Sequence, residues 1–292
     1  MSTEAQTLMT KLGFDIGIAG ETGFLLTFHD EPSRALTVLI IRIADNLSAH
    51  FGALITDLAP AYKTLAIFYD MTHPNTSALH PYLIALSQNV SLELSRAVSR
   101  QIDVHAGVFD STPDSSPEGS PDNSRNSSVD APLNTTIEGS GITQRALNNV
   151  SEQQIALPVY YDSAVAPDLL ALATYAGLSI EQLIALHTGT SYTAYANGFA
   201  PGFCYLGHVD SALAVPRHAT PRAAVAAGSV AIADRQTAVY PRQSPGGWRI
   251  IGRCPLPLFD AYEQPPNKIN VGDTVRFYAV DRECFLSLGG IL

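Results

Sequence analysis

Cysteine is scarce in this sequence of 292 residues, which contains three: Cys204, Cys254 and Cys284. They are widely separated, odd in number and without a CxxC pair. This pattern argues against a disulfide framework or a zinc knuckle and is typical of a reducing cytoplasm.

Long apolar runs are also missing. The longest, Leu36–Ile43, is interrupted by Arg42 and is far shorter than the roughly 18 residues that a membrane helix needs. The first eleven residues have neither the basic segment nor the apolar segment of a secretory signal. We therefore expect a cytoplasmic protein that has no membrane partner.

Lysine is equally rare, and none of the three lysines follows a glycine, which excludes a phosphate-binding P-loop. No GxGxxG motif follows a predicted strand, so ATP would bind to another kind of site or to a partner. The histidines show no metal-ligand spacing and have no paired carboxylates, so no metal site is predicted. The residues concerned are Lys11, Lys63, Lys268, His187, His208 and His218.

Negative charge dominates the chain, with 27 acids against 17 bases and a net charge of -10, which disfavours binding to nucleic acid. The segment Arg217–Arg253 has a positive net charge, because it contains six arginines and one acid, Asp234. A positive segment in an acidic protein suits a small carboxylate, phosphate or other oxyanion. The alternative is that these arginines lie on solvated strand faces and pair with acids elsewhere.

Composition divides the chain into three parts, which we predict as an N-terminal α+β domain over residues 1–110, a flexible Ser/Asn/Pro-rich insertion over 111–154 and a domain over 155–292. In the first part we expect strands at 23–28, 54–58 and 64–69, with helices at 32–49 and 77–86 on one face of the sheet. In the last part, short strands at 229–233, 237–240, 248–252 and 273–280 indicate a compact barrel or sandwich.

Two short helices precede those strands. The first begins near Pro167 and ends at Gly177, and the second begins with a capping box of Ser179 and Gln182. The pair resembles a DNA-binding helix-turn-helix, but its second helix carries Glu181 and no basic residue. We therefore expect a structural helical hairpin.

Glycines alternate with aromatic residues from Gly198 to Gly207. Glycine permits close backbone approach to a ligand and aromatic rings provide a flat wall, although a buried corner of a β domain uses the same residue types. Cys204 and His208 suggest thiol catalysis, but an inert buried cysteine is the favoured interpretation.

The segment from Gln236 to Trp248 carries the sharpest pattern. Backbone N–H groups around Gly246 and Gly247 would form an anion-binding nest, and Gln236, Tyr240 and Ser244 would orient an amide or carboxylate. The alternative is a hairpin turn whose glycines only provide positive φ.

Several motifs occur in one order and together resemble the family of the 5-oxoprolinase B subunit (PxpB/KipI), whose sequences are also labelled allophanate hydrolase subunit 1 or carboxyltransferase subdomain C/D. The resemblance covers nearly the whole chain except 111–154. A departure is Asp234-Arg235, where glycines are usual. The motifs are 60–65, 198–207, 216–222, 227–230, 236–237, 240–241, 244–253 and 265–273.

The resemblance implies an α+β N-terminal domain and a cyclophilin-like β-barrel C-terminal domain. It also implies a hetero-oligomer with subunits C and A that cleaves 5-oxoproline to glutamate with ATP as co-substrate, and no activity of this chain alone. It leaves the catalytic residue open. The residues that match the family's motifs, and that we expect to bind substrate, are Arg217, Arg222, Gln236, Tyr240, Ser244, Gly246 and Gly247.

Two other functions stay open. Some relatives are named as inhibitors of a sensor histidine kinase, which would make this a binding protein. Related domains also serve as carboxyltransferase-type subunits in urea degradation, and that role would need biotin on a separate carrier because the chain has no biotin-accepting Met-Lys motif.

Overall fold

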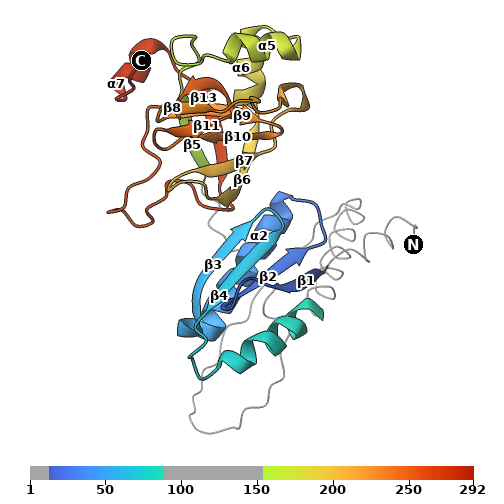
Figure 1. Ribbon diagram of the computed structural model, residues 1–292. Coiled ribbons are helices and arrows are strands. Elements are labelled where there is room, and N and C mark those ends of the chain that lie inside the picture. Colours follow the sequence, from blue (N-terminus) through green and yellow to red (C-terminus); the bar gives the residue numbers. More distant parts are fainter. Residues whose placement is uncertain (1–12, 89–153) are drawn as a thin grey trace, which may run out of the picture.

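The computed structural model describes residues 13–88 and 154–292, and each range forms its own group of elements (Figure 1). In the first range four antiparallel strands follow the order β1-β2-β4-β3. The elements are β1 (Phe14–Ile18), β2 (Gly23–Phe28), α2 (Arg34–Phe51), η1 (Gly52–Leu54), β3 (Ile55–Ala61), β4 (Thr64–Tyr69) and a helix over residues 76–88.

The helices of the first range pack on one face of this sheet. α2 begins after Ser33, whose Oγ accepts a hydrogen bond from the Leu36 N–H at 3.2 Å. Leu36, Ile40 and Leu47 recur at helical spacing and join sheet residues such as Leu26 in one apolar core, which also contains side chains of the helix over 76–88. The predicted sheet with helices on one face is confirmed.

In the second range one sheet follows the order β6-β7-β10-β9-β12, and β13 adds to β6 and pairs with β5 in parallel. Strands β8 and β11 form a separate two-stranded sheet. The elements are β5 (Gln154–Val159), α5 (Leu169–Ala176), α6 (Ile180–Gly189), β6 (Ser191–Asn197), β7 (Cys204–Gly207), η2 (Ser211–Leu213), β8 (Arg222–Val225), β9 (Ser229–Ala233), β10 (Gln236–Val239), β11 (Ser244–Gly246), β12 (Arg249–Arg253), β13 (Thr274–Ala279) and α7 (Arg282–Ser287).

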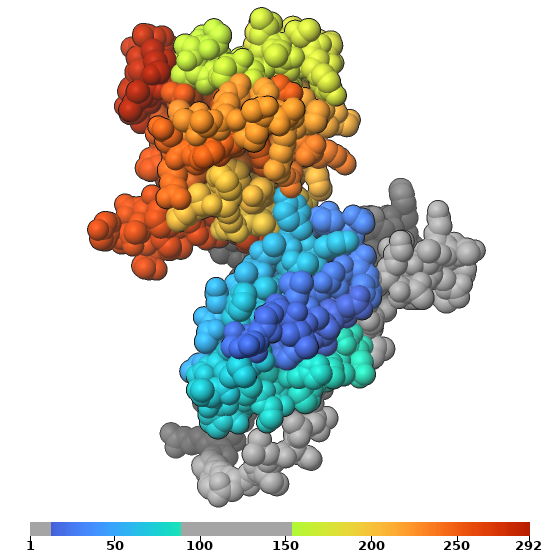
Figure 2. Space-filling model, in the orientation of Figure 1, coloured from blue at the N-terminus to red at the C-terminus, as the bar shows by residue number. Residues whose placement is uncertain are grey.

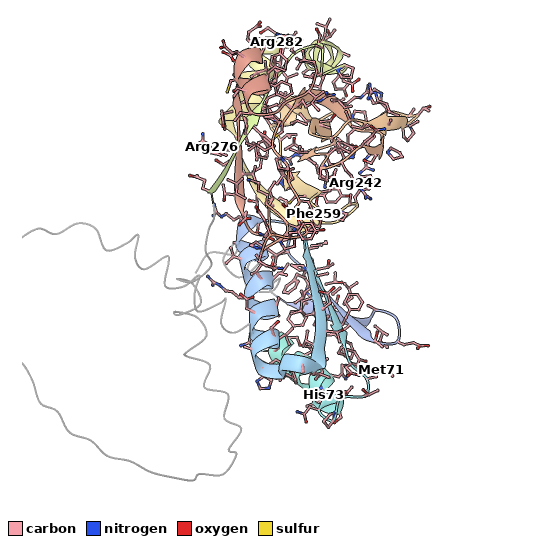
Figure 3. The ribbon with its side chains drawn as sticks, turned by 90° about the vertical axis from the view of Figure 1, so that its left-hand side faces the viewer. Met71, His73, Arg242, Phe259, Arg276 and Arg282 are labelled. Carbon is pink, nitrogen blue, oxygen red and sulfur yellow. The ribbon has the colours of Figure 1, made fainter. Side chains whose placement is uncertain are left out.

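The two ranges share one sheet but have separate apolar cores. The link between them is the pairing of Ala61 in β3 with Ala196 in β6. Figure 2 shows the two groups in contact where the end of the N-terminal sheet meets the C-terminal part. Figure 3 shows Phe259 near this junction, whereas Met71 and His73 lie at the far end of the N-terminal sheet. The boundary at 110 and all of the predicted insertion at 111–154 except Gln154, which begins β5, lie outside the described residues, so the division into domains stays a prediction.

The strands of the described residues do not form a closed barrel, so the β-barrel that the resemblance implied is wrong in this respect. β5 and β12 come together at one isolated bridge, between Tyr160 and Arg253, with N···O distances of 2.9 and 3.0 Å. On its other edge, β12 has a bulge between Ile250 and Gly252 in its pairing with β9. The described part is a mixed fold with a large, mainly antiparallel sheet.

The predicted helical hairpin is present as α5 and α6. α5 ends at Gly177, which has a φ of 67°, and α6 begins with the predicted capping box of Ser179 and Gln182. No single helix in the described ranges is long and apolar enough to cross a membrane. Helices α5 and α6, which meet at an angle of 90°, reach the length and apolar composition of a membrane span only when they are taken together. Both helices place side chains in the core, Leu172 and Leu183 among them.

His187 connects this hairpin to the sheet. The buried ring accepts a hydrogen bond from the Tyr161 hydroxyl at Nδ1 (2.7 Å) and its Nε2 contacts the Thr237 hydroxyl at 3.0 Å. Thr237 donates its own proton to the Ala231 carbonyl, so Nε2 carries the ring proton. Burial lowers the pKa of His187 to about 3, and the ring is therefore neutral at pH 7.

His187 predicts acid lability. The pKa of His187 is lower in the folded than in the unfolded state, so the unfolded state binds more protons between about pH 6.5 and 3. The free energy of unfolding therefore decreases by about 1.4 kcal/mol for each pH unit by which the pH is lowered in this range. We expect His187→Gln to be less stable than the wild type at pH 7.5, with the difference shrinking as pH falls below about 6.5. Urea unfolding at pH 7.5, 6.0 and 5.0 measures this, and a constant difference would contradict it.

Candidate functional site

Strands β7, β9, β10 and β12 carry an aromatic cluster on the face opposite their main core. Because side chains alternate between faces, Leu206 lies in the core whereas Tyr205 lies in the cluster. Phe203 is packed edge to face with Tyr205, with ring centroids 4.9 Å apart. The neighbouring cluster positions on β9 and β10 are occupied by the small residues Ala231, Ala233 and Ala238, which leave room for the rings. Tyr240 and Trp248 complete the cluster.

Two of the predicted substrate residues, Arg217 and Tyr240, meet at this cluster. The Arg217 guanidinium carbon lies 5.6 Å from the centroid of the Trp248 ring, a cation–π contact that holds the charge in place. Burial raises the pKa of Tyr240, whereas the charges of Arg217 and Arg222 oppose that rise. The Tyr240 hydroxyl therefore stays protonated near these two cations.

Gly246 is required for a reason that the sequence did not indicate. A Cβ at this position would lie 2.3 Å from the Tyr240 hydroxyl oxygen, so a side chain is excluded by close packing. Gly246 belongs to extended β11, and neither it nor Gly247 has a left-handed φ. Neither glycine therefore provides the positive φ that the alternative hairpin turn would use, whereas anion binding by the backbone N–H groups here stays a prediction.

Gln236 contacts a residue that the sequence did not suggest as a site residue. Its Nε2 donates a hydrogen bond to the hydroxyl of Tyr62, which lies in the turn between β3 and β4. The Tyr62 ring stacks on Tyr195 with centroids 5.4 Å apart, and the Tyr62 N–H donates to the Tyr195 carbonyl at 3.0 Å. Tyr62 was inside a matching motif, 60–65, but only the pairing of β3 with β6 brings it to Gln236.

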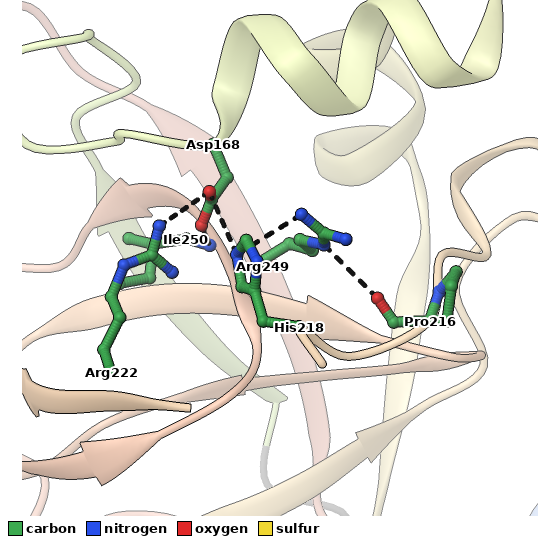
Figure 4. Close-up of polar contacts among 6 residues, drawn as sticks. All are labelled: Asp168, Pro216, His218, Arg222, Arg249 and Ile250. Carbon is green, nitrogen blue, oxygen red and sulfur yellow. Dashed lines mark hydrogen bonds and ion pairs between the residues drawn. The ribbon is translucent and has the colours of Figure 1, made fainter. Parts of the chain in front are cut away.

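Asp168 is the centre of a second polar group, shown in Figure 4, and is 4% exposed. Its Oδ1 accepts hydrogen bonds from Arg222 Nη2 at 2.7 Å and from His218 Nε2 at 3.1 Å, and its Oδ2 accepts the Ile250 N–H at 2.7 Å. Burial alone would raise the pKa of this carboxyl, but the hydrogen bonds, that of Arg222 first, leave it below its ordinary value. Asp168 therefore stays charged and ties the start of α5 to β8 and β12.

The guanidinium of Arg222 is therefore bound to the fold through one nitrogen, and a second nitrogen remains for a ligand. Its Nη2 is bound to Asp168, whereas its Nη1 is buried and has no hydrogen-bond partner among the described residues. The Ser244 hydroxyl, on the paired strand β11, is buried and unpartnered in the same way. An unsatisfied buried donor costs about 1–3 kcal/mol, so two of them indicate groups that a bound molecule or water completes.

Arg249 is held away from the aromatic cluster. Its Nε donates to the Pro216 carbonyl at 3.3 Å, and its Nη1 lies 3.4 Å from His218 Nε2 (Figure 4). The same His218 nitrogen donates its proton to Asp168, so its approach to Arg249 Nη1 is a contact and not a hydrogen bond. These contacts fix the segment 216–222 that also carries Arg217.

The other predicted features have structural roles. Cys204 is buried on the core side of β7, and burial raises the pKa of its thiol, so the favoured inert cysteine is confirmed. Asp234-Arg235 forms the turn between β9 and β10, in which Asp234 has a φ of 52°. The Asp234 N–H and the Arg235 carbonyl are bound to Val215 and Val209, so this turn offers neither group to a ligand.

Comparison with known proteins gives this arrangement a family. Residues 14–108 and 122–269 match the carboxyltransferase domain, subdomain C and D. The chain belongs to this family. It is 42% identical over 134 residues to the B subunit of the 5-oxoprolinase of Bacillus subtilis (strain 168), and 46% identical over 123 residues to that of Escherichia coli O157:H7.

These matches are partial. They cover 46% and 42% of this chain and 56% of each relative, so the chain spans about half the length of the curated relatives it matches. Among solved structures, TTHA0988 has a TM-score of 0.61 and 27% identity over 89% of this chain and 40% of its own. The urea carboxylase of Kluyveromyces lactis has a TM-score of 0.60 at 15% identity, covering 94% of this chain and 22% of its own, which shows a common fold alone.

The close packing at Gly246 gives a direct prediction. Gly246→Ala forces Tyr240 to move and lowers the free energy of unfolding by about 1–3 kcal/mol. Gly247→Ala is the control, because its Cβ would lie 3.6 Å from the nearest atom. Equal thermal stability of the two variants would refute the packing role of Gly246.

The hydrogen bonds of Asp168 to Arg222, His218 and Ile250 give a second prediction. Asp168→Asn keeps the shape but removes the charge that Arg222 contacts, and we expect a loss of about 1–3 kcal/mol in urea unfolding. Asp162→Asn is the matched control, since the less buried Asp162 also accepts a backbone N–H, from Ala164 at 2.8 Å. An equally small loss in both variants would show that Asp168 does not tie these elements together.

Proposed function

We propose that this chain is the B subunit of an ATP-dependent 5-oxoprolinase complex that hydrolyses 5-oxoproline to glutamate. The observation that carries the proposal is the set of predicted substrate residues around one aromatic cluster, with Arg217 on Trp248 and Gln236 beside Tyr62. The names of the relatives at 42% and 46% identity support the same substrate.

The chemistry of 5-oxoproline suits these groups. Its carboxylate calls for a fixed cation, for which Arg217 is suited, because the Trp248 ring holds the guanidinium while leaving its N–H groups exposed. Its five-membered lactam is a poor electrophile, so ATP is needed to activate the carbonyl. Hydroxyl and amide donors near the developing oxyanion would stabilise the transition state, and Tyr240 and Ser244 are candidates.

The proposed complex is a cytoplasmic hetero-oligomer with subunits C and A. The chain has no P-loop, so we assign ATP to the complex, with its site on another surface of this chain or on a partner. No observation on this chain favours inhibition of a sensor histidine kinase, and the likeness to urea carboxylase concerns the fold.

The test is ATP-dependent release of glutamate from 5-oxoproline by this chain co-expressed with the proposed C and A subunits. Arg217→Ala should raise the KM for 5-oxoproline roughly tenfold or more, because it removes a charge-assisted hydrogen bond to the carboxylate. Arg276→Ala removes an exposed arginine of β13, which Figure 3 shows on the opposite edge of the C-terminal part from Arg242, and should leave KM unchanged. Absence of glutamate release by the assembled wild-type complex would refute the proposed function.

A further inference from the structure

The hydrogen bond between Gln236 and Tyr62 joins the two described parts of the chain at the aromatic cluster. Tyr62 lies within 6.5 Å of the Tyr205 ring, measured between centroids, and so touches the edge of that cluster. Tyr205 in turn lies 6.0 Å from Trp248, the ring that carries Arg217, again measured between centroids. Gln236, Tyr62 and Arg217 therefore border the same aromatic cluster, although they come from β10, the β3–β4 turn and the loop before β8.

The hydrogen bonds fix what this pair offers to a ligand. Gln236 Nε2 donates to the Tyr62 oxygen, so the Tyr62 proton is free to be donated elsewhere. Gln236 Oε1 accepts no hydrogen bond within residues 13–88 and 154–292. Burial raises the pKa of Tyr62, which keeps the hydroxyl protonated and able to donate. Gln236 and Tyr62 thus present one acceptor beside one donor, and both side chains are only partly buried.

We propose that Tyr62 and Gln236 bind the amide of a small lactam carboxylate while Arg217 binds its carboxylate. A lactam carries an N–H donor beside a carbonyl acceptor, the complement of Gln236 Oε1 and the Tyr62 hydroxyl. The identity of the ligand as 5-oxoproline rests on the proposed function. Tyr62 also acts as a positioning residue, because its hydroxyl fixes the orientation of the Gln236 carboxamide.

The stacking of Tyr62 on Tyr195 limits its movement. The two rings are inclined by 22°, and the backbone of Tyr62 is bound to that of Tyr195 at 3.0 Å. Tyr62 also has a φ of 50°, which fixes the turn that presents it. The N-terminal sheet therefore supplies a wall of the site and one donor, the Tyr62 hydroxyl, that the C-terminal part alone does not have.

Trp248 is the only tryptophan in the chain and lies under Arg217, so its fluorescence reports binding at this site. The full-length chain is titrated with 5-oxoproline, with proline, which lacks the ring carbonyl, and with 2-pyrrolidone, which lacks the carboxylate. The wild type should bind 5-oxoproline more tightly than either. Tyr62→Phe, which keeps the ring stack, should weaken 5-oxoproline roughly tenfold or more and leave proline unchanged.

Three further variants make this test specific. Tyr195→Phe removes a hydroxyl from the same ring stack without touching Gln236, and should bind 5-oxoproline like the wild type. Gln236→Met keeps the side-chain length and should reproduce the effect of Tyr62→Phe, which guards against a folding defect in either variant. Arg217→Ala should weaken 5-oxoproline and proline equally and leave 2-pyrrolidone unchanged.

Each outcome decides the inference. Equal affinity of wild type and Tyr62→Phe for 5-oxoproline overturns it, as does a wild-type chain that binds none of the three compounds. A uniform loss for all three compounds in Tyr62→Phe assigns the residue to structure alone and also overturns it. If the chain binds 5-oxoproline as expected but the assembled complex releases no glutamate, the proposed function fails and the amide-binding role stands.

Discussion

The sheet β7-β10-β9-β12 is covered on both faces, and the candidate site depends on that constraint. Alternate residues of each strand face the apolar core, and the residues between them face the aromatic cluster. A shift of register by one residue would turn Ile232 or Val239 out of the core and put Ala233 or Tyr240 in its place. The rings and the Arg217 guanidinium that rests on them are therefore positioned by the packing of the core behind them.

A second constraint is the carboxylate of Asp168, which is buried and has three donors. Because a charge that has lost its partners is expensive to bury, β8, β12 and the entry to α5 must stay together. This explains why Arg222, expected to bind substrate, is partly committed to the fold. The unpartnered Nη1 of Arg222 and hydroxyl of Ser244 are the groups on this side of the site that remain for a ligand.

Local patterns predicted much of the fold. Alternating residues and turn signals located β2, β4 and β9 at their observed bounds, and the capping box at Ser179 located α6. Strand β6, with its small and polar residues, and strand β11, which contains Pro245, carry no such signal and were missed. The roles of Tyr62 and Asp168 depend on contacts 174 and 54 residues away in the chain, to Gln236 and Arg222, which no local pattern contains. The sequence pattern marked Gly246 as a turn or backbone-binding residue, but it did not show that Gly246 packs against the Tyr240 hydroxyl, which leaves no room for a side chain.

One small lactam carboxylate is proposed to bind between Arg217, Gln236 and Tyr62. A crystal structure of the full-length chain with 5-oxoproline tests it most directly. We predict the carboxylate on Arg217, the ring N–H on Gln236 Oε1 and the ring carbonyl on the Tyr62 hydroxyl. A ligand seated away from the Trp248 cluster, or one that leaves Tyr62 and Gln236 bound only to each other, would contradict it.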